Sequence, residues 1–281
     1  MIFDDYLKTR QLSSDTIIRY KKLLEPFFDW MKDKGQKEEE IVYSDLLGYI
    51  KTCRTNEQGT RYINQQLTAI RHYYNYLKYT GKVSGSPAAG LFVKGSRKTV
   101  PHNLLNEEQL RTLYQNLTSE EEATKQDKAM LGLMIWQGLL SNDMAVLEPH
   151  HLKLREGKIE IPGTGKTERR ILSLEAGQII DLYEYLTKGN PSNEKLFTGT
   201  GKESDLQNVQ DKLIRKLRKK HTFLINANQI RQSRISLWIK QYDIRQVQYL
   251  AGHKYVSSTE RYKSTDLEDL QKELEKHHPG S

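Results

Sequence analysis

The sequence is nearly without cysteine: Cys53 is the single one among 281 residues. One cysteine forms neither an internal disulfide nor a cysteine-based metal site, so disulfide-stabilised secreted folds and zinc ribbons are excluded. A lone cysteine is more often a small apolar packing residue than a nucleophile. This cysteine usage fits a protein of the reducing cytoplasm.

Long apolar runs are missing as well. The apolar stretch at 129–140, AMLGLMIWQGLL, is shorter than the roughly 18 residues that a membrane span needs, and we expect it to form a buried core helix. The first residues, MIFDDYLKTR, are acidic and do not resemble a signal peptide. We find no internal repeat and no low-complexity tract. The sequence therefore predicts a globular protein without membrane or secretory segments.

Positive charge is what the sequence has in excess. The 44 Lys and Arg residues against 36 Asp and Glu give a formal net charge of +8 and a pI of about 9.2. Such a surplus indicates a polyanionic partner, and nucleic acid is the most common one in a cytoplasm. Six of the cations lie in DKLIRKLRKKH at 211–221, and three lie in KGSRK at 94–98. The chain is long enough for two domains that each bury a core.

Residues 1–82 are predicted to form a compact helical domain. Ser13 or Ser14 can cap a helix that ends at Gly35, and further helices are expected over 43–52 and 60–79. Apolar residues recur at steps of three and four along the first and third of these helices. They are Ile17, Tyr20, Leu24, Phe27 and Met31 in the first, and Leu67, Ile70, Tyr74 and Leu77 in the third.

The third helix also carries Arg61, Arg71 and Lys78, which are candidate DNA contacts; a merely solvated helix face is the alternative. Residues 83–104 are rich in Gly, Ser and Pro, and predict an extended interdomain linker. The linker cations Lys94, Arg97 and Lys98 can follow a DNA backbone between two lobes. Alternatively, the segment is a plain tether whose charge keeps it soluble.

Residues 105–281 are predicted to form a second domain. It begins with Asn106 as a helix N-cap, followed by two glutamates in the first turn, where the helix dipole favours them. Alternating apolar residues over 152–174 predict a short sheet of two or three strands. Helices are expected over 174–188, 206–220 and 229–241, and a short amphipathic helix is expected at the end of the chain.

The stretch at 228–262, NQIRQSRISLWIKQYDIRQVQYLAGHKYVSSTERY, places Arg231, His253 and Tyr262 in order. This trio suits phosphodiester chemistry. A phenolic oxygen can attack the phosphorus, a guanidinium can hold the non-bridging oxygens, and an imidazole can donate or accept a hydrogen bond. Taken alone, each of the three residues has a more ordinary structural role, since Tyr262 is one of 16 tyrosines.

The stretch resembles the signature of the tyrosine recombinase, or phage integrase, family, which is commonly H-x-L-R-H, then L-G-H, then Y. Arg231, Gly252, His253 and Tyr262 match it, whereas Asn228 and Gln232 stand where the pattern usually has histidines. The resemblance extends from Phe3 to the closing HHPG. It implies a mostly α protein: an N-terminal helical, SAM-like core-binding domain and a C-terminal mixed α/β catalytic domain with a small β-sheet. The two-domain layout resembles the Xer-like members.

The resemblance also implies roles for residues. Tyr262 attacks double-stranded DNA to give a 3′-phosphotyrosine, Arg231 clamps the phosphate and His253 assists. Lys166, in the hairpin text GTGKTERR, protonates the 5′-hydroxyl leaving group; a solubilising charge is the alternative. Asn228 and Asp143 complete the expected site, and Arg169, Arg170 and Arg234 are candidate DNA contacts. The resemblance implies no metal, cofactor or small-molecule substrate. It does imply a homo-oligomer, which is a tetramer in the synapse.

One departure from the family pattern concerns QGLLSNDMAVL at 137–147, where Leu140 occupies the place of the first catalytic arginine. Two interpretations follow. In one, another arginine fills the vacancy and the enzyme is active; the candidates are Arg155, Arg169, Arg170 and Arg234. In the other, the chain is a weakened or inactive DNA-binding relative in which Leu140→Arg restores cleavage. A helical protein–protein module with a basic surface is a distant third. We favour activity because Lys166, Arg231, His253 and Tyr262 occur together.

Overall fold

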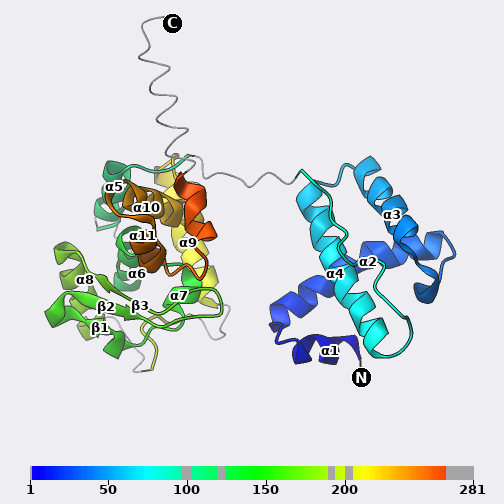
Figure 1. Ribbon diagram of the computed structural model, residues 1–281. Helices are drawn as coiled ribbons and strands as arrows, with labels where there is room; N and C mark the ends of the chain where they lie inside the picture. Colours follow the sequence, from blue (N-terminus) through cyan, green and yellow to red (C-terminus); the bar gives the residue numbers. More distant parts are fainter. Residues whose placement is uncertain (1, 96–102, 119–123, 189–193, 200–204, 264–281) are drawn as a thin grey trace, which may run out of the picture. The chain divides into compact units, whose positions relative to one another are not determined.

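A computed structural model describes residues 2–95, 103–118, 124–188, 194–199 and 205–263. The chain divides into two compact units, Met1–Lys98 and Thr99–Ser281 (Figure 1). Within the described ranges, no helix combines the length and apolarity that crossing a membrane requires.

The first unit is all-helical. Its elements are α1 (Phe3–Thr9), α2 (Ser14–Asp33), the short 3-10 helix η1 (Glu38–Glu40), α3 (Tyr43–Thr55) and α4 (Thr60–Tyr79). Ser13 caps α2 by accepting a hydrogen bond from the backbone N–H of Thr16, and Gly35 turns the chain after α2 with φ +64°. The apolar stripes expected on the two long helices are buried, apart from the partly buried Tyr20. The predicted helical domain is therefore confirmed in its elements.

Part of the expected linker is folded onto this unit. Asn64 on α4 exchanges two hydrogen bonds with the backbone of Val93, at 2.9 and 2.8 Å. Ala88, Leu91 and Val93 are buried in the core of the first unit. Residues 83–93 are thus not an extended tether in this structure, because their apolar side chains cover the α4 face that would otherwise be exposed. Residues 96–102 lie outside the described residues.

The second unit surrounds a large apolar core with helices and one small sheet (Figure 1). Its helices are α5 (Glu107–Thr118), α6 (Lys125–Trp136), α7 (Ser141–Met144), α8 (Ala176–Lys188), α9 (Asp205–Lys220), α10 (Ala227–Gln241) and α11 (Ile244–Ala251), with short 3-10 helices η2 (Pro149–His151) and η3 (Leu154–Glu156). Asn106 accepts a hydrogen bond from the backbone N–H of Gln109, as expected of a helix N-cap. The apolar helix ends earlier than predicted, at Trp136, because Gly138 adopts φ +62°.

The sheet has three antiparallel strands in the order β1 (Leu152–Lys153), β2 (Lys158–Ile161) and β3 (Arg170–Ser173). The register pairs Ile159 with Leu172 and Ile161 with Arg170. Side chains alternate between the two faces of a strand. Arg170 therefore shares the buried face of β3 with Leu172, and this alternation carries a charged side chain into the interior.

Candidate active site

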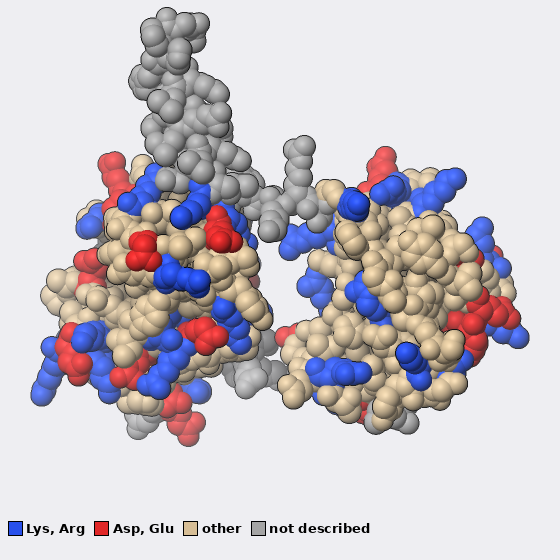
Figure 2. Space-filling view, viewed as in Figure 1, with Lys and Arg blue, Asp and Glu red and all other residues tan. Residues whose placement is uncertain are grey.

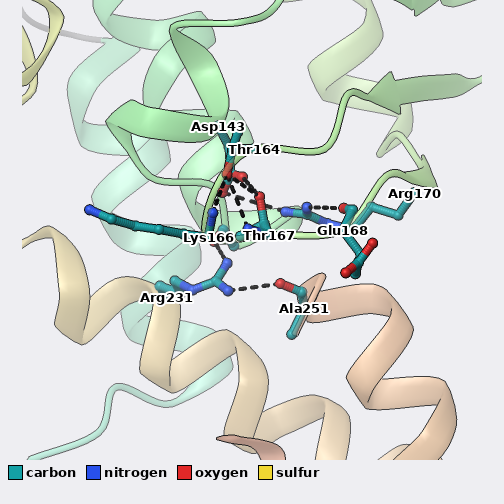
Figure 3. A network of polar contacts seen from close by, with 9 residues as sticks. Asp143, Thr164, Lys166, Thr167, Glu168, Arg170, Arg231 and Ala251 are labelled. Carbon is teal, nitrogen blue, oxygen red and sulfur yellow. Dashed lines mark hydrogen bonds and ion pairs between the residues drawn. The ribbon is translucent and has the colours of Figure 1, made fainter. Parts of the chain in front are cut away.

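Arg231 ties together two loops of the second unit. It lies one turn into α10, which Asn226 caps by accepting a hydrogen bond from the backbone N–H of Gln229. The Arg231 side chain is buried, and its Nη1 and Nη2 donate to the carbonyl oxygens of Gly138 (2.6 Å) and Ala251 (2.8 Å) (Figure 3). Burial lowers the pKa of Arg231, and the nearby Asp143 and Tyr262 oppose that shift. Arg231 therefore joins the loop before α7 to the end of α11.

The β2–β3 hairpin pairs with the loop that follows α11. Thr167 forms an isolated antiparallel bridge with His253, and the backbone N–H of Glu168 donates to the carbonyl of Gly252 at 2.9 Å. Lys166 lies next to this bridge with an exposed side chain, which points away from Asp143 and Arg170 in Figure 3. The fold thus brings the hairpin that carries Lys166 beside the loop of Gly252 and His253. The role expected of the Lys166 ammonium stays a prediction.

A buried ion pair lies beneath these loops. Asp143 on α7 is 3% exposed and accepts a hydrogen bond from Thr167 Oγ1 at 2.7 Å. Arg170 Nη2 is 3.5 Å from Asp143 Oδ2, and Arg170 Nη1 donates to the carbonyl of Glu168 at 3.2 Å. Burial lowers the pKa of Arg170, while Asp143 opposes the shift. Nε and Nη2 of Arg170 have no hydrogen-bond partner, so Asp143 supplies the main compensation for this buried charge.

Gly252 is required by the position of Arg170. A Cβ at residue 252 would lie 2.3 Å from Arg170 Nη1, and Gly252 has φ +65°. We expect Gly252→Ala to lower the midpoint of thermal unfolding, because the left-handed backbone alone costs about 1 kcal/mol or more. Gly165→Ala, on the hairpin, is the control, since its Cβ would meet nothing within 4 Å. Equal midpoints for the two variants would contradict this account of the Arg170 packing.

Tyr262 lies in a helix over 257–263 and is 1% exposed. Its ring belongs to a small apolar cluster with Ile235, Trp238, Val247 and Ala251. The His253 ring stacks beside it, with centroids 6.4 Å apart and an interplanar angle of 18°. Because Arg231 donates to Ala251, two residues before His253, the fold brings Arg231, His253 and Tyr262 into one region.

His253 is held in its neutral form. Its Nδ1 is 2.8 Å from Thr259 Oγ1. Burial, followed by Arg231, Arg261 and Arg170, lowers the pKa of His253 to about 4, and Asp143 only partly opposes this. A neutral imidazole keeps one nitrogen as an acceptor at neutral pH. It can therefore accept a proton or a hydrogen bond at the site.

This depressed pKa predicts a pH dependence of stability. The folded state holds His253 with a pKa of about 4, below the value of about 6.5 of an unfolded chain. Between these values the unfolded chain binds the extra proton, so stability falls as the pH is lowered from 6.5 toward 4. We expect wild type to lose about 1 to 2 kcal/mol more between pH 7 and pH 5 than His253→Asn does, in urea denaturation. A difference between wild type and His253→Asn below about 0.5 kcal/mol would contradict this effect of the buried imidazole.

Two candidate DNA contacts, Arg234 and Arg71, donate hydrogen bonds to backbone carbonyls inside their own units. Arg234 is 7% exposed; its Nε donates to the carbonyl of Ile135 at 2.6 Å, and its Nη1 pairs with Glu107 at 3.3 Å. Arg71 donates to the carbonyls of Ala88 and Leu91, at 3.0 and 2.9 Å. These donors fix α10 against its neighbours and hold 83–93 on α4, and a DNA contact by either residue stays a prediction. The side chain of the third candidate, Arg170, is fully buried on Asp143.

The remaining candidates lie on surfaces. Arg61, Lys78 and Lys94 are exposed on the first unit, Asn228 is exposed in the first turn of α10, and Arg155 is exposed in η3. Arg169 is exposed, with Nη2 3.7 Å from Glu160. Arg97 and Lys98 lie outside the described residues. Figure 2 shows basic side chains spread over the visible face of each unit with acidic ones among them, so the net charge is not gathered into one patch there.

Sequence reasoning missed Arg261. Its Nη2 donates to Tyr262 Oη at 3.0 Å, and its guanidinium carbon lies 4.9 Å from the centroid of the tyrosine ring. The only signal was its place directly before the expected nucleophile in the text TERY. Regarding metals, the described part of the chain contains no group of three or more His, Cys, Asp or Glu that could hold an ion.

Comparison with known proteins identifies relatives across the whole length. Curated relatives include the tyrosine recombinase XerC of Histophilus somni (strain 2336), 27% identical over 98% of this chain and 95% of the relative, and XerD of Shewanella oneidensis, 26% identical over 98% and 94%. Solved structures with the same fold include two that are bound to DNA or a DNA substrate. One is the XerH site-specific recombinase bound to a palindromic difH substrate, with TM-score 0.76, 20% identity and coverage of 96% of this chain and 82% of that one. The other is the Tn1549 transposon integrase in complex with transposon right end DNA, with TM-score 0.66, 12% identity and 99% of both chains covered.

Family models match both units. The model described as the N-terminal SAM-like domain of phage integrase matches residues 2–81, and the model of the phage integrase family matches residues 103–268. The second match alone spans more than half of the chain. With its helical first unit and its small sheet among helices in the second, the chain belongs to the phage integrase family of tyrosine recombinases.

Proposed function

We propose that this protein is a site-specific DNA recombinase that cleaves and rejoins double-stranded DNA through a 3′-phosphotyrosine. The observation that carries the proposal is the convergence of Arg231, His253 and Tyr262, from three separate segments, around the end of α11. The relatives named above support it, since XerC and XerD are named tyrosine recombinases and XerH a site-specific recombinase bound to its substrate.

The reaction replaces one phosphodiester bond of the DNA with a phosphodiester bond to Tyr262. Tyr262 Oη attacks the scissile phosphorus, a bond forms between Oη and phosphorus, and the bond to the 5′-oxygen breaks. The phenolic proton leaves toward an acceptor such as neutral His253, and the 5′-oxygen takes up a proton. The bond energy stays in the phosphotyrosine, so attack by a 5′-hydroxyl reverses the step. Arg231 supplies positioning and charge stabilisation, on which phosphoryl transfer mainly depends.

Three further residues have proposed supporting roles. Lys166 gives a proton to the 5′-oxygen: its exposed side chain, on a hairpin paired to the His253 loop, gives the ammonium freedom to reach into DNA. Asn228, three residues before Arg231 and exposed on the same helix, donates a hydrogen bond to a phosphate oxygen. Asp143 orders the site from below through Thr167 and Arg170.

The partner we propose is double-stranded DNA, acted on in the cytoplasm, with four copies of the chain in the synapse. The first unit and the second contact the duplex as two lobes, with residues 1–82 as the core-binding domain and 105–281 as the catalytic domain. Exposed cations are the phosphate contacts in this proposal: Arg61, Lys78, Lys94 and Arg169. Arg97 and Lys98 stay candidates from the sequence. Such contacts make affinity fall with salt concentration.

The proposal is tested by trapping the intermediate. A duplex nicked close to the scissile phosphate loses its 5′-hydroxyl fragment after cleavage, so the protein stays attached. We expect a covalent protein–DNA complex whose linked peptide contains Tyr262 by mass spectrometry. Binding to a set of duplexes without any adduct would contradict the proposal.

That second outcome defines the other candidate, a DNA-binding relative that does not cut. The observation favouring it is Leu140, whose half-buried apolar side chain stands at the N-terminus of α7, where the family pattern has an arginine. The trapping assay separates the two candidates, because both require salt-sensitive binding and only the recombinase forms an adduct.

A further inference from the structure

The structure accounts for the four arginines that the sequence offered as substitutes for the residue missing at Leu140. Arg234 is bound to Glu107, and Arg170 is buried on Asp143 with a side-chain exposure of 0%. Arg169 extends toward Glu160, and Arg155 is exposed in η3, after β1. None of these four guanidinium groups makes a described contact with Tyr262. The second cation at the nucleophile must therefore be sought elsewhere.

Arg261 contacts the attacking atom directly. Its Nη2 lies 3.0 Å from Tyr262 Oη, and the guanidinium stands over the tyrosine ring at 4.9 Å. The Arg261 side chain is exposed, whereas the Tyr262 ring is buried among apolar residues. An exposed guanidinium therefore contacts the phenolic oxygen of a tyrosine whose ring is buried.

We propose that Arg261 is a catalytic residue that supplies the second guanidinium of the site, in place of the arginine absent at Leu140. The inference rests on the proposed function. Once Tyr262 Oη is bonded to phosphorus, the non-bridging oxygens are two bonds away from Oη. A donor held 3.0 Å from Oη in the free protein is then within reach of those oxygens. As the bond forms, a second N–H of the Arg261 guanidinium donates to a non-bridging oxygen of the phosphate.

The chemistry of the group fits this role. A guanidinium carries a permanent charge and several donors in a planar fork, so it can keep one hydrogen bond on Oη while another forms to phosphate. Arg231 has two of its nitrogens committed to the carbonyls of Gly138 and Ala251, which leaves fewer of its donors for the phosphate. An additional guanidinium is what such a site lacks for the charge that develops in the transition state.

The test compares Arg261→Gln with wild type on the nicked duplex. Glutamine can still donate a hydrogen bond to Tyr262 Oη but carries no charge. We expect covalent adduct to form about 10² to 10³-fold more slowly, with duplex affinity changed little. Arg261→Lys, which keeps the charge but not the fork, should fall between the two. Lys263→Gln, on the other side of Tyr262 and also exposed, is the matched control and should form adduct at a rate close to wild type.

A second substrate separates charge stabilisation from structural support. A methylphosphonate at the scissile position removes one negative charge from the phosphate, so a cation that balances this charge becomes less important. We expect the defect of Arg261→Gln to shrink at least about tenfold on this substrate. An equal defect on both substrates, or a rate equal to wild type on the phosphate, overturns the inference. The proposed function fails separately, when wild type forms no adduct or when Tyr262→Phe still forms one.

Discussion

Replacing Tyr262 with phenylalanine is expected to abolish the covalent protein–DNA adduct and to leave DNA binding intact. The substitution removes one atom, Oη, which is the proposed nucleophile, and keeps the ring that packs with Ile235, Trp238 and Val247. The lost hydrogen bond is donated by the exposed Arg261, which can turn to water, so the expected loss of stability is within about 1 kcal/mol. Adduct formation on the nicked duplex should fall below detection, as measured on denaturing gels.

The matched control is Tyr255→Phe. Tyr255 lies between His253 and Tyr262 and is 73% exposed, so it is the tyrosine of this loop that DNA can most easily reach. We expect full adduct formation from Tyr255→Phe and none from Tyr262→Phe, with equal duplex affinity for both. An adduct of unchanged yield in Tyr262→Phe would show that a different nucleophile is used, and would remove the basis for assigning Arg231 and His253 to the same reaction.

The helices were the part of the fold most accessible from the sequence. The helix expected over 60–79 is α4 with the same bounds, because its apolar stripe is a local signal. Local signals also predicted a short sheet of two or three strands, and the structure has three. The short α11 was not anticipated, although Asp243 caps it with two hydrogen bonds to backbone N–H groups, because eight residues give little periodicity to detect.

The candidate site was only partly accessible. The order of Arg231, His253 and Tyr262 could be read from the sequence, because the family pattern fixes their spacing. The contacts of each arginine could not be predicted from the sequence, because they are tertiary contacts. Arg71 and Arg170 are both arginines, and the sequence does not distinguish their surroundings. Arg71 binds backbone carbonyls of 83–93, whereas Arg170 pairs with a buried carboxylate. A sequence records that a residue is charged, whereas its partner depends on which segments the fold brings together.

The packing of Arg170 leads to the largest expected effect on stability. Arg170→Met keeps an unbranched side chain of similar length on the buried face of β3, but leaves the carboxylate of Asp143 with Thr167 as its hydrogen-bond donor. Removing one partner of a buried ion pair costs about 3 to 5 kcal/mol, and we expect the lower end of this range because Arg231 also interacts with the charge of Asp143. We expect this loss in the free energy of unfolding from urea denaturation of the full chain at pH 7. Arg169→Met, one residue earlier and exposed, should change it by less than about 0.5 kcal/mol.

A double variant identifies the cause of the loss. In Arg170→Met/Asp143→Asn, the asparagine keeps an oxygen that accepts from Thr167 Oγ1 and carries no charge. If the uncompensated carboxylate is what destabilises Arg170→Met, the double variant should be more stable than the single one, by about 1 kcal/mol or more. A double variant no more stable than Arg170→Met would contradict this. The lost free energy of unfolding would then come from poor packing of the methionine side chain. The comparison matters for function, because Arg170 contacts both loops of the site. It packs against Gly252, next to His253, and it donates a hydrogen bond to the carbonyl of Glu168 on the hairpin.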